Sequence, residues 1–226
     1  FNIFILSCLI YFSSYRNNLS KKLEVKVEFS EKPKLFDDSL VNKLLTQKFG
    51  PKFNLYKDSL DLNMLENQLK TIPELENVEI FIAPEGKLVF QLTERKPLFI
   101  VIGDNHFYSD KNGVLFPFKK FDSISFPKFL NSSSSLSLKT TAGLIDKLYE
   151  DSFLSREIES IYAMENQYIL DLKSYNFQVI LGKPNQIIEK IKKLKVFCAF
   201  QNVQDSSKKY KKINLSYNNQ VVASTL

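Results

Sequence analysis

The sequence is poor in the residues from which metal sites and disulfide frameworks are built. It has no tryptophan, two cysteines and a single histidine, His106, among 226 residues. One histidine, without any Cys-x-x-Cys or His-Glu-x-x-His spacing, supplies too few ligands, so we expect no metal site and no bound cofactor. Cys8 lies in an apolar run and Cys198 in a predicted helix, and we expect no disulfide between such different environments.

Arginine is also scarce. Arg16, Arg95 and Arg156 are the only arginines, so lysine supplies most of the basic charge behind the net charge of +6. Proteins that bind nucleic acid favour the forked guanidinium group for phosphates and base edges. The composition therefore favours a solvated lysine-rich surface over a nucleic-acid interface. With 44% hydrophobic and 25% charged residues, the chain suits one large or two small globular domains.

The chain opens with the apolar run FNIFILSCLIYF, followed by small polar residues and then basic ones. A bilayer span needs about 20 apolar residues, so this run alone is too short. Because the chain begins with Phe, we expect residues 1–16 to be the C-terminal part of a transmembrane helix whose start is missing. A signal-peptide core and a buried soluble helix are the alternatives, although no small-x-small cleavage site follows. The side chains expected in the membrane are Phe4, Ile5, Leu6, Leu9, Ile10 and Phe12.

Residues 75–97, LENVEIFIAPEGKLVFQLTERKP, predict two strands joined by a tight turn. Apolar residues recur at every second position on both sides of the turn, which is the period of a half-buried strand. Pro84, Glu85 and Gly86 suit a short connection, because proline presets φ and glycine tolerates a positive φ. Pro97 ends the second strand, since it has no N–H to donate to a ladder.

The residues before this hairpin predict one strand and two helices. Residues 23–29 alternate apolar and charged side chains, as an amphipathic strand does. Asp37 or Asp38 can cap one helix, and Asp61 can cap a second. Residues 22–96 therefore predict an α+β domain in the order strand, helix, helix, strand, strand. Two helices on one face of a three-stranded sheet would make a compact two-layer unit.

The pattern changes after Pro97. Residues 97–226 predict a second domain that is mainly antiparallel sheet with one or two helices. Helical spacing marks residues 139–151 and the stretch after Pro184. Strands are expected at residues 98–102, 114–118, 126–130, 158–164, 168–172, 177–181, 213–217 and 220–223.

Several short segments, taken in order, resemble the FtsQ/DivIB family. The element order of residues 22–96 resembles a POTRA domain, and LTERKP resembles the family's ERxP exit. Next, FYSDKNGVLFP resembles its D-x-x-G segment, while FPKFL falls at its P-x-x-x-G segment but lacks the glycine. The stretch from Leu181 to Pro184 resembles its "lG…K…L" segment. KINLSYNNQVV resembles its terminal motif, with Asn214 and Ser216 in place of the usual Asp and Arg. The Tyr- and Lys-rich style is similar to that of Bacteroidetes members.

The resemblance implies a bitopic cell-division protein of the inner membrane, with the bulk of the chain in the periplasm. It implies partners of the FtsB and FtsL type, which are single-pass division proteins. It also implies a scaffold that helps recruit and regulate septal peptidoglycan synthesis, without enzymatic activity or a small-molecule substrate. Within the POTRA domain, Glu94 and Arg95 are candidates for recruitment, and an ordinary ion pair at a strand exit is the alternative.

The candidate site is an open strand edge near the C-terminus. An edge strand has unpaired N–H and C=O groups, so a partner strand can add to it. We place this edge at residues 213–217, together with 220–223. Tyr217 and Asn219 match, by resemblance, the family's partner-binding strand and its adjoining turn, although Tyr217 could merely cover the sheet. The side chains expected to contact a partner are Ile213, Leu215, Ser216, Tyr217, Asn219 and Val221.

Two other functions compete with a scaffold. An envelope hydrolase would need a nucleophile beside a base, or a metal. Asp104, His106 and Asp110 lack a nucleophile at a fixed turn, so we interpret them as loop residues. A POTRA-bearing envelope transport or assembly protein would need many more alternating strands than residues 97–226 contain.

Overall fold

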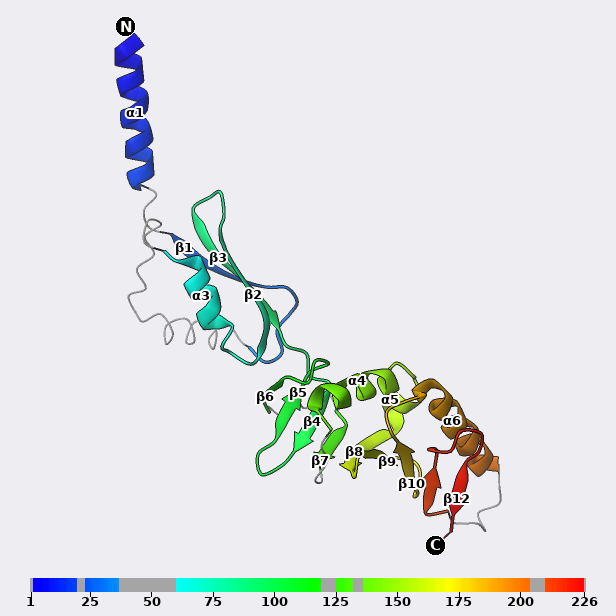
Figure 1. Ribbon diagram of the computed structural model, residues 1–226. Coiled ribbons are helices and arrows are strands. Elements are labelled where there is room, and N and C mark those ends of the chain that lie inside the picture. Colours follow the sequence, from blue (N-terminus) through cyan, green and yellow to red (C-terminus); the bar gives the residue numbers. More distant parts are fainter. Residues whose placement is uncertain are drawn as a thin grey trace. The chain divides into compact units, whose positions relative to one another are not determined.

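The computed structural model describes residues 2–19, 23–36, 60–118, 125–131, 136–203 and 210–225. The chain divides into two compact units, Phe1–Arg95 and Lys96–Leu226 (Figure 1). The helix expected after Asp37 or Asp38 lies outside the described residues.

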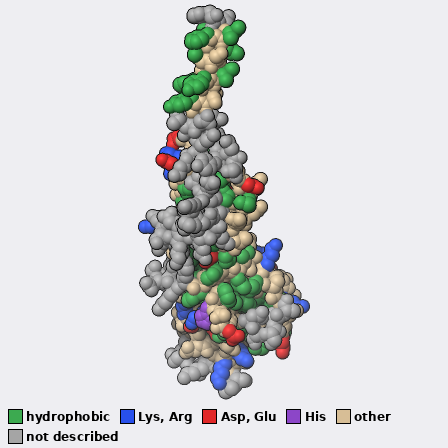
Figure 2. Space-filling view, turned by 90° about the vertical axis from the view of Figure 1, so that its left-hand side faces the viewer, with side chains coloured by type: hydrophobic (Ala, Val, Ile, Leu, Met, Phe, Trp, Pro, Cys, Tyr) green, Lys and Arg blue, Asp and Glu red, His purple; other side chains and the backbone are tan. Residues whose placement is uncertain are grey.

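Helix α1 (Asn2–Leu19) exposes mainly apolar side chains between Ile3 and Phe12. The six side chains expected in the membrane are all exposed on it, and Figure 2 shows hydrophobic side chains around this helix. Tyr11 and Tyr15, one turn apart, stack with their ring centroids 6.4 Å apart. Among the described residues, no helix is both long enough and apolar enough to cross a bilayer.

The first unit holds a three-stranded sheet of β1 (Glu24–Phe29), β2 (Leu75–Ile82) and β3 (Lys87–Glu94). Strand β3 lies at the centre, antiparallel to β2 and parallel to β1. The predicted hairpin is confirmed, and its turn is closed by a 2.9 Å hydrogen bond from the Gly86 N–H to the Ala83 carbonyl.

Helix α3 (Leu62–Leu69) packs on this sheet through Leu65 and Leu69. Its predicted cap is confirmed, because the Asp61 carboxylate accepts a 3.0 Å hydrogen bond from the Met64 N–H. The sheet residues that face the helix are buried at every second position of their strands, as the side-chain period of two requires. They are Val78, Ile80, Leu88, Phe90 and Leu92.

Glu66 ties α3 to the edge strand β2. Its carboxylate accepts a 3.0 Å hydrogen bond from the Ile80 N–H, and Lys70 pairs with it at 3.2 Å. The bond from Ile80, helped by Lys70, lowers the pKa of Glu66. A free N–H on an edge strand can pair with another strand. Because Glu66 accepts the Ile80 N–H, this group of β2 is already hydrogen-bonded.

The second unit holds a nine-stranded sheet in the order β12-β11-β10-β9-β8-β7-β4-β5-β6. Three junctions are parallel, namely β4 with β7, β7 with β8, and β10 with β11, and the other five are antiparallel. The sheet is therefore mixed, with antiparallel pairs in the majority. The strands are β4 (Phe99–Ile102), β5 (Phe107–Ser109), β6 (Leu115–Pro117), β7 (Lys128–Asn131), β8 (Ile158–Met164), β9 (Gln167–Leu172), β10 (Gln178–Gly182), β11 (Lys212–Asn214) and β12 (Val222–Ser224).

Helices α4 (Leu138–Tyr149), α5 (Leu154–Glu157) and α6 (Ile187–Val203) belong to this unit (Figure 1). The described residues thus contain one short helix, α5, beyond the one or two predicted. A connection between two parallel neighbouring strands has to cross over the sheet. Helices lie in two of the three such connections of this unit. Helices α4 and α5 join β7 to β8, and α6 joins β10 to β11.

The core of the second unit lies between the helices and one face of the sheet. Leu144, Ile145 and Leu148 of α4 and Leu194 of α6 belong to it, and the buried Thr141 hydroxyl lies 2.9 Å from the Tyr168 hydroxyl. A register row of core-facing residues crosses the sheet from β12 to β4. It consists of Ala223, Ile213, Val179, Leu170, Ile161, Phe129 and Val101.

Candidate protein-binding edge

Strand β12 is one edge of the nine-stranded sheet. Its residues Val222, Ala223 and Ser224 pair with β11, and no other described strand pairs with it. Because strand residues alternate between the two faces, Ala223 lies on the core side, while Val222 and Ser224 lie on the opposite face. Val222 is exposed. The strand is therefore free on one side to accept the backbone of another chain.

The structure corrects the expected position of this edge. The rim was expected at residues 213–217 together with 220–223. Strand β12 overlaps the second range, but β11 lies between β10 and β12. Ile213 and Leu215 are completely buried in the core, so the prediction that their side chains contact a partner is wrong. The physical reason is the α6 crossover, which sets β11 parallel to β10 beneath the helix and leaves β12 to form the rim.

The other predicted contact residues lie around the connection between β11 and β12. Ser216, Tyr217 and Asn219 are exposed, and 49% of Tyr217 is accessible. Ser216 is held locally, because its backbone N–H donates to the Asn214 side-chain oxygen at 2.9 Å. Val221 is partly buried against the core. The accessible features beside the free edge are thus the Tyr217 ring and the turn that follows it.

Helix α6 fixes this turn through Lys193. Its ammonium group donates a 2.8 Å hydrogen bond to the Tyr217 carbonyl and a second, shorter one to the Asn218 carbonyl. Three residues earlier, the buried Lys190 donates to the Lys183 carbonyl at 2.7 Å and to the Asn185 side chain at 3.0 Å. Burial, with a contribution from Lys193, lowers the pKa of Lys190.

Neither Lys190 nor Lys193 is among the predicted site residues. The sequence places both on a lysine-rich helix, but it carries no signal of which carbonyl group each ammonium group meets. A close contact completes the arrangement, because a Cβ built on Gly182 would lie 2.9 Å from the Ser216 Cβ. The end of β10, the start of α6 and the exit of β11 therefore form one packed corner.

Glu94 and Arg95 are occupied within the first unit. The Glu94 carboxylate accepts hydrogen bonds from the backbone N–H groups of Lys34 at 2.7 Å, Phe36 at 3.0 Å and Leu35. Arg95 donates to the carbonyl groups of Pro73 at 2.8 Å and Leu75 at 2.9 Å. Both side chains therefore bind backbone groups of neighbouring segments.

The structure assigns Asp110 and His106 to separate local environments. Asp110 is buried and accepts hydrogen bonds from the backbone N–H groups of Asn112 at 2.9 Å and Val114 at 2.8 Å. The His106 ring packs edge-on against Phe118, with centroids 6.0 Å apart. Within the described residues, no group of three or more His, Cys, Asp or Glu side chains could hold a metal ion.

The accessible edge of β12, rather than a reactive pocket, is the feature of the second unit that best fits a protein-binding module. The family described as "FtsQ/DivIB, C-terminal related" matches residues 96–224, nearly all of this unit and more than half of the chain. The chain belongs to the FtsQ/DivIB family, which indicates a cell-division protein. A search of curated proteins finds no match.

Proposed function

We propose that this chain is a non-enzymatic scaffold of cell division that receives a strand from an FtsB- or FtsL-like single-pass protein. The observation that carries the proposal is the free side of β12, next to the exposed Tyr217. Main-chain hydrogen bonds would supply affinity, and the side chains around the edge would supply selectivity. Through this contact the chain would help recruit and regulate septal peptidoglycan synthesis.

The proposal also gives roles to the rest of the chain. Its exposed apolar side chains suit α1 for the interior of the inner membrane, with residues 22–96 and the second unit on the periplasmic side. Residues 22–96 would form a POTRA domain with a recruiting role. Because Glu94 and Arg95 bind backbone groups, they would support recruitment by holding the shape of that domain.

The test is a titration of the purified chain with candidate single-pass coiled-coil proteins from the same cell. Tyr217→Ala removes an exposed aromatic ring beside the edge and should cost about 2 kcal/mol of binding free energy, or about 30-fold in Kd. Met164→Ala is the matched control, because Met164 on β8 is similarly exposed, at 45% against 49% for Tyr217. Equal affinity of the two variants for every candidate would refute the proposal.

Cysteine cross-linking would test strand addition itself. In a Cys8→Ser background, Val222→Cys places a thiol on the exposed face of β12, while the native Cys198 stays buried. Side chains of an added strand alternate between faces, so cross-links should form at every second partner position. A yield that shows no period of two along the partner would argue for a contact other than strand addition.

A further inference from the structure

Helix α6 is apolar on two opposite faces. Its inner face is buried in the core through Ile187, Ile191, Leu194 and Cys198. Its outer face carries a second apolar row, which we name the outer stripe and which consists of Val196, Ala199, Phe200 and Val203. A helix that covers a sheet normally presents polar residues to water on this side. Phe200 also contacts Phe197, with ring centroids 6.2 Å apart, but the exposed part of the outer stripe is not explained by the packing of the second unit.

The outer stripe has the spacing of a helix-packing seam. Its members follow one another at i, i+3, i+4 and i+7, which places them on one line along the helix. Val196 is 70% exposed, Phe200 45% and Val203 87%, and Ala199 is exposed as well. The same spacing forms the contact rows of packed helices, and a small residue such as Ala199 lets a second backbone approach closely.

The charges beside the outer stripe are mainly positive. Besides the buried Lys190, helix α6 contains Lys192, Lys193 and Lys195 and one acidic residue, Glu189. Lys192 is exposed and lies one helical turn before Val196, in line with the outer stripe. Lys195 borders it on the side of α4 and pairs with Asp151 at 2.8 Å. An occupant with acidic side chains would complement the exposed Lys192 in line with the outer stripe.

Two other occupants fit these charges less well. A second copy of the chain would bring its own lysine-rich α6 against this one, so like charges would oppose the contact. An anionic lipid surface would meet acidic residues on the α4 side, because Glu150, Asp151 and Glu189 line the hollows between α4 and α6. A single helix that covers the segment from Lys192 to Val203 can place its carboxylates beside Lys192 and avoid Glu150 and Asp151. Glu189 lies two helical turns before Val196, outside this segment.

We propose that the outer stripe of α6 docks an amphipathic helix of a partner protein, one whose apolar seam is flanked by Asp or Glu. This site is separate from the β12 edge and does not depend on strand addition there. Because Lys193 of the same helix holds the carbonyls of Tyr217 and Asn218, a docked helix would lie on the element that fixes the β11–β12 turn.

The test uses two labelled coiled-coil peptides of about 21 residues, or three heptads, titrated against the full chain by fluorescence anisotropy. Both have leucine at positions a and d. One has glutamate at e and g, and the other has lysine there, so each repels itself and stays monomeric. We expect the acidic peptide to bind at least about tenfold more tightly than the basic one, and this preference to shrink at high salt.

Variants of the chain locate the binding. Val203→Glu should weaken binding of the acidic peptide by about tenfold or more, because it places a negative charge in the apolar seam that the acidic peptide would contact. Lys192→Glu should reduce or reverse the preference for the acidic peptide. Met164→Glu is the matched control, since it also exchanges an exposed apolar side chain for glutamate and lies outside α6. Circular dichroism would verify that each variant is folded.

Each outcome decides the proposal. It fails if neither peptide binds, if both bind equally, or if Val203→Glu binds as well as the unmodified chain. Self-association that Val203→Glu abolishes in sedimentation would assign the outer stripe to a second copy instead. Flotation with anionic vesicles that Val203→Glu abolishes would assign it to lipid. Tyr217→Ala should leave peptide binding unchanged, so failure of the β12 proposal and failure of this one are distinguishable.

Discussion

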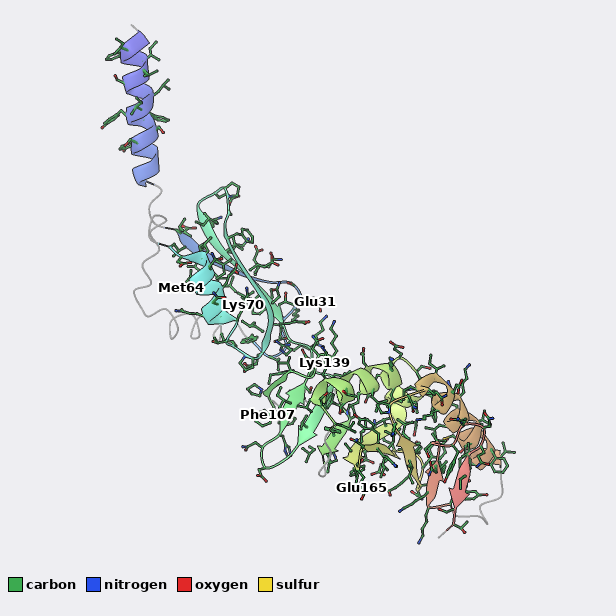
Figure 3. All side chains as sticks on the ribbon, in the orientation of Figure 1. Glu31, Met64, Lys70, Phe107, Lys139 and Glu165 are labelled. Carbon is green, nitrogen blue, oxygen red and sulfur yellow. The ribbon has the colours of Figure 1, made fainter. Side chains whose placement is uncertain are left out.

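Gly113 lies directly against Lys139: a Cβ built on Gly113 would come within 2.6 Å of the Lys139 backbone nitrogen. Gly113 has a φ of +78°, in the region that other residues rarely adopt. Asp110 closes the same turn by accepting two backbone hydrogen bonds. The D-x-x-G segment therefore holds the β5–β6 turn against the first turn of α4, where Figure 3 labels Lys139.

Gly113→Ala should destabilise the second unit by about 2 kcal/mol or more. The added methyl group is strained by the positive φ and collides with backbone atoms, which cannot rotate away as a side chain could. The measurement is the midpoint of chemical unfolding of the full chain, followed by near-ultraviolet circular dichroism of its tyrosines.

Gly143→Ala is the matched control for that prediction. Gly143 lies inside α4, and a Cβ built on it meets nothing within 4 Å. Alanine there should stabilise the chain by up to about 1 kcal/mol, because it favours the helix more than glycine does. Similar unfolding midpoints for the two alanine variants would contradict the argument from the Gly113 contact.

Glu94→Ala should loosen the segment that follows β1. It removes the acceptor of three backbone hydrogen bonds from residues 34–36 and should cost about 2 kcal/mol or more. Amide hydrogen exchange of Leu35 and Phe36 in the full chain is the direct measurement, and both should exchange faster. Glu76→Ala, an exposed change on β2, should leave their exchange unaltered. Protection that survives Glu94→Ala would remove the structural role given to this carboxylate.

Local patterns predicted local structure well. The alternation of β2 and β3 and the cap at Asp61 depend on neighbours in the chain, so they can be read from the sequence. Strand order depends on distant pairings that alternation does not encode. The parallel pairing of β1 with β3 and the insertion of β7 between β4 and β8 were therefore outside such a prediction.

The candidate site shows the same limit. A short apolar strand has the same sequence pattern at the edge of a sheet and in its interior. The pattern therefore could not predict that β11 pairs with a strand on each side. On α6, Ile188 is exposed although Ile187 and Ile191 are buried. Apolar residues occupy both faces of this helix, and helical spacing alone cannot choose which face meets the core.

Cys198 should resist alkylation while the chain is folded. It is buried, and its burial raises the pKa of the thiol from 9.0 to about 11. Iodoacetamide at pH 9 should therefore label the exposed Cys8 rapidly and Cys198 only after unfolding. Mass spectrometry of the labelled chain, with and without urea, checks this, and equal labelling of both thiols in native buffer would contradict it.

The same burial predicts alkaline destabilisation. The folded state favours the neutral thiol, which is why its pKa is higher there than in the unfolded chain. The stability that Cys198 contributes is therefore complete below the unfolded pKa of 9.0 and is lost as the pH rises toward 11. Over that window each such group lowers the free energy of unfolding by up to about 1.4 kcal/mol per pH unit. Burial also raises the pKa of Tyr149 to about 12, which extends the loss to higher pH. Cys198→Ala should flatten the profile between pH 9 and 11.

Lys193→Met should free the turn that precedes β12 without disturbing the core. Methionine keeps most of the apolar stem but cannot donate to the Tyr217 and Asn218 carbonyls, which lose a charged hydrogen-bond partner. Amides in residues 217–224 should exchange faster, while those of β8 and β9 keep their protection. Lys192→Met changes a neighbouring exposed lysine and should alter neither set. If residues 217–224 exchange equally in both variants, then α6 does not position the edge on which strand addition depends.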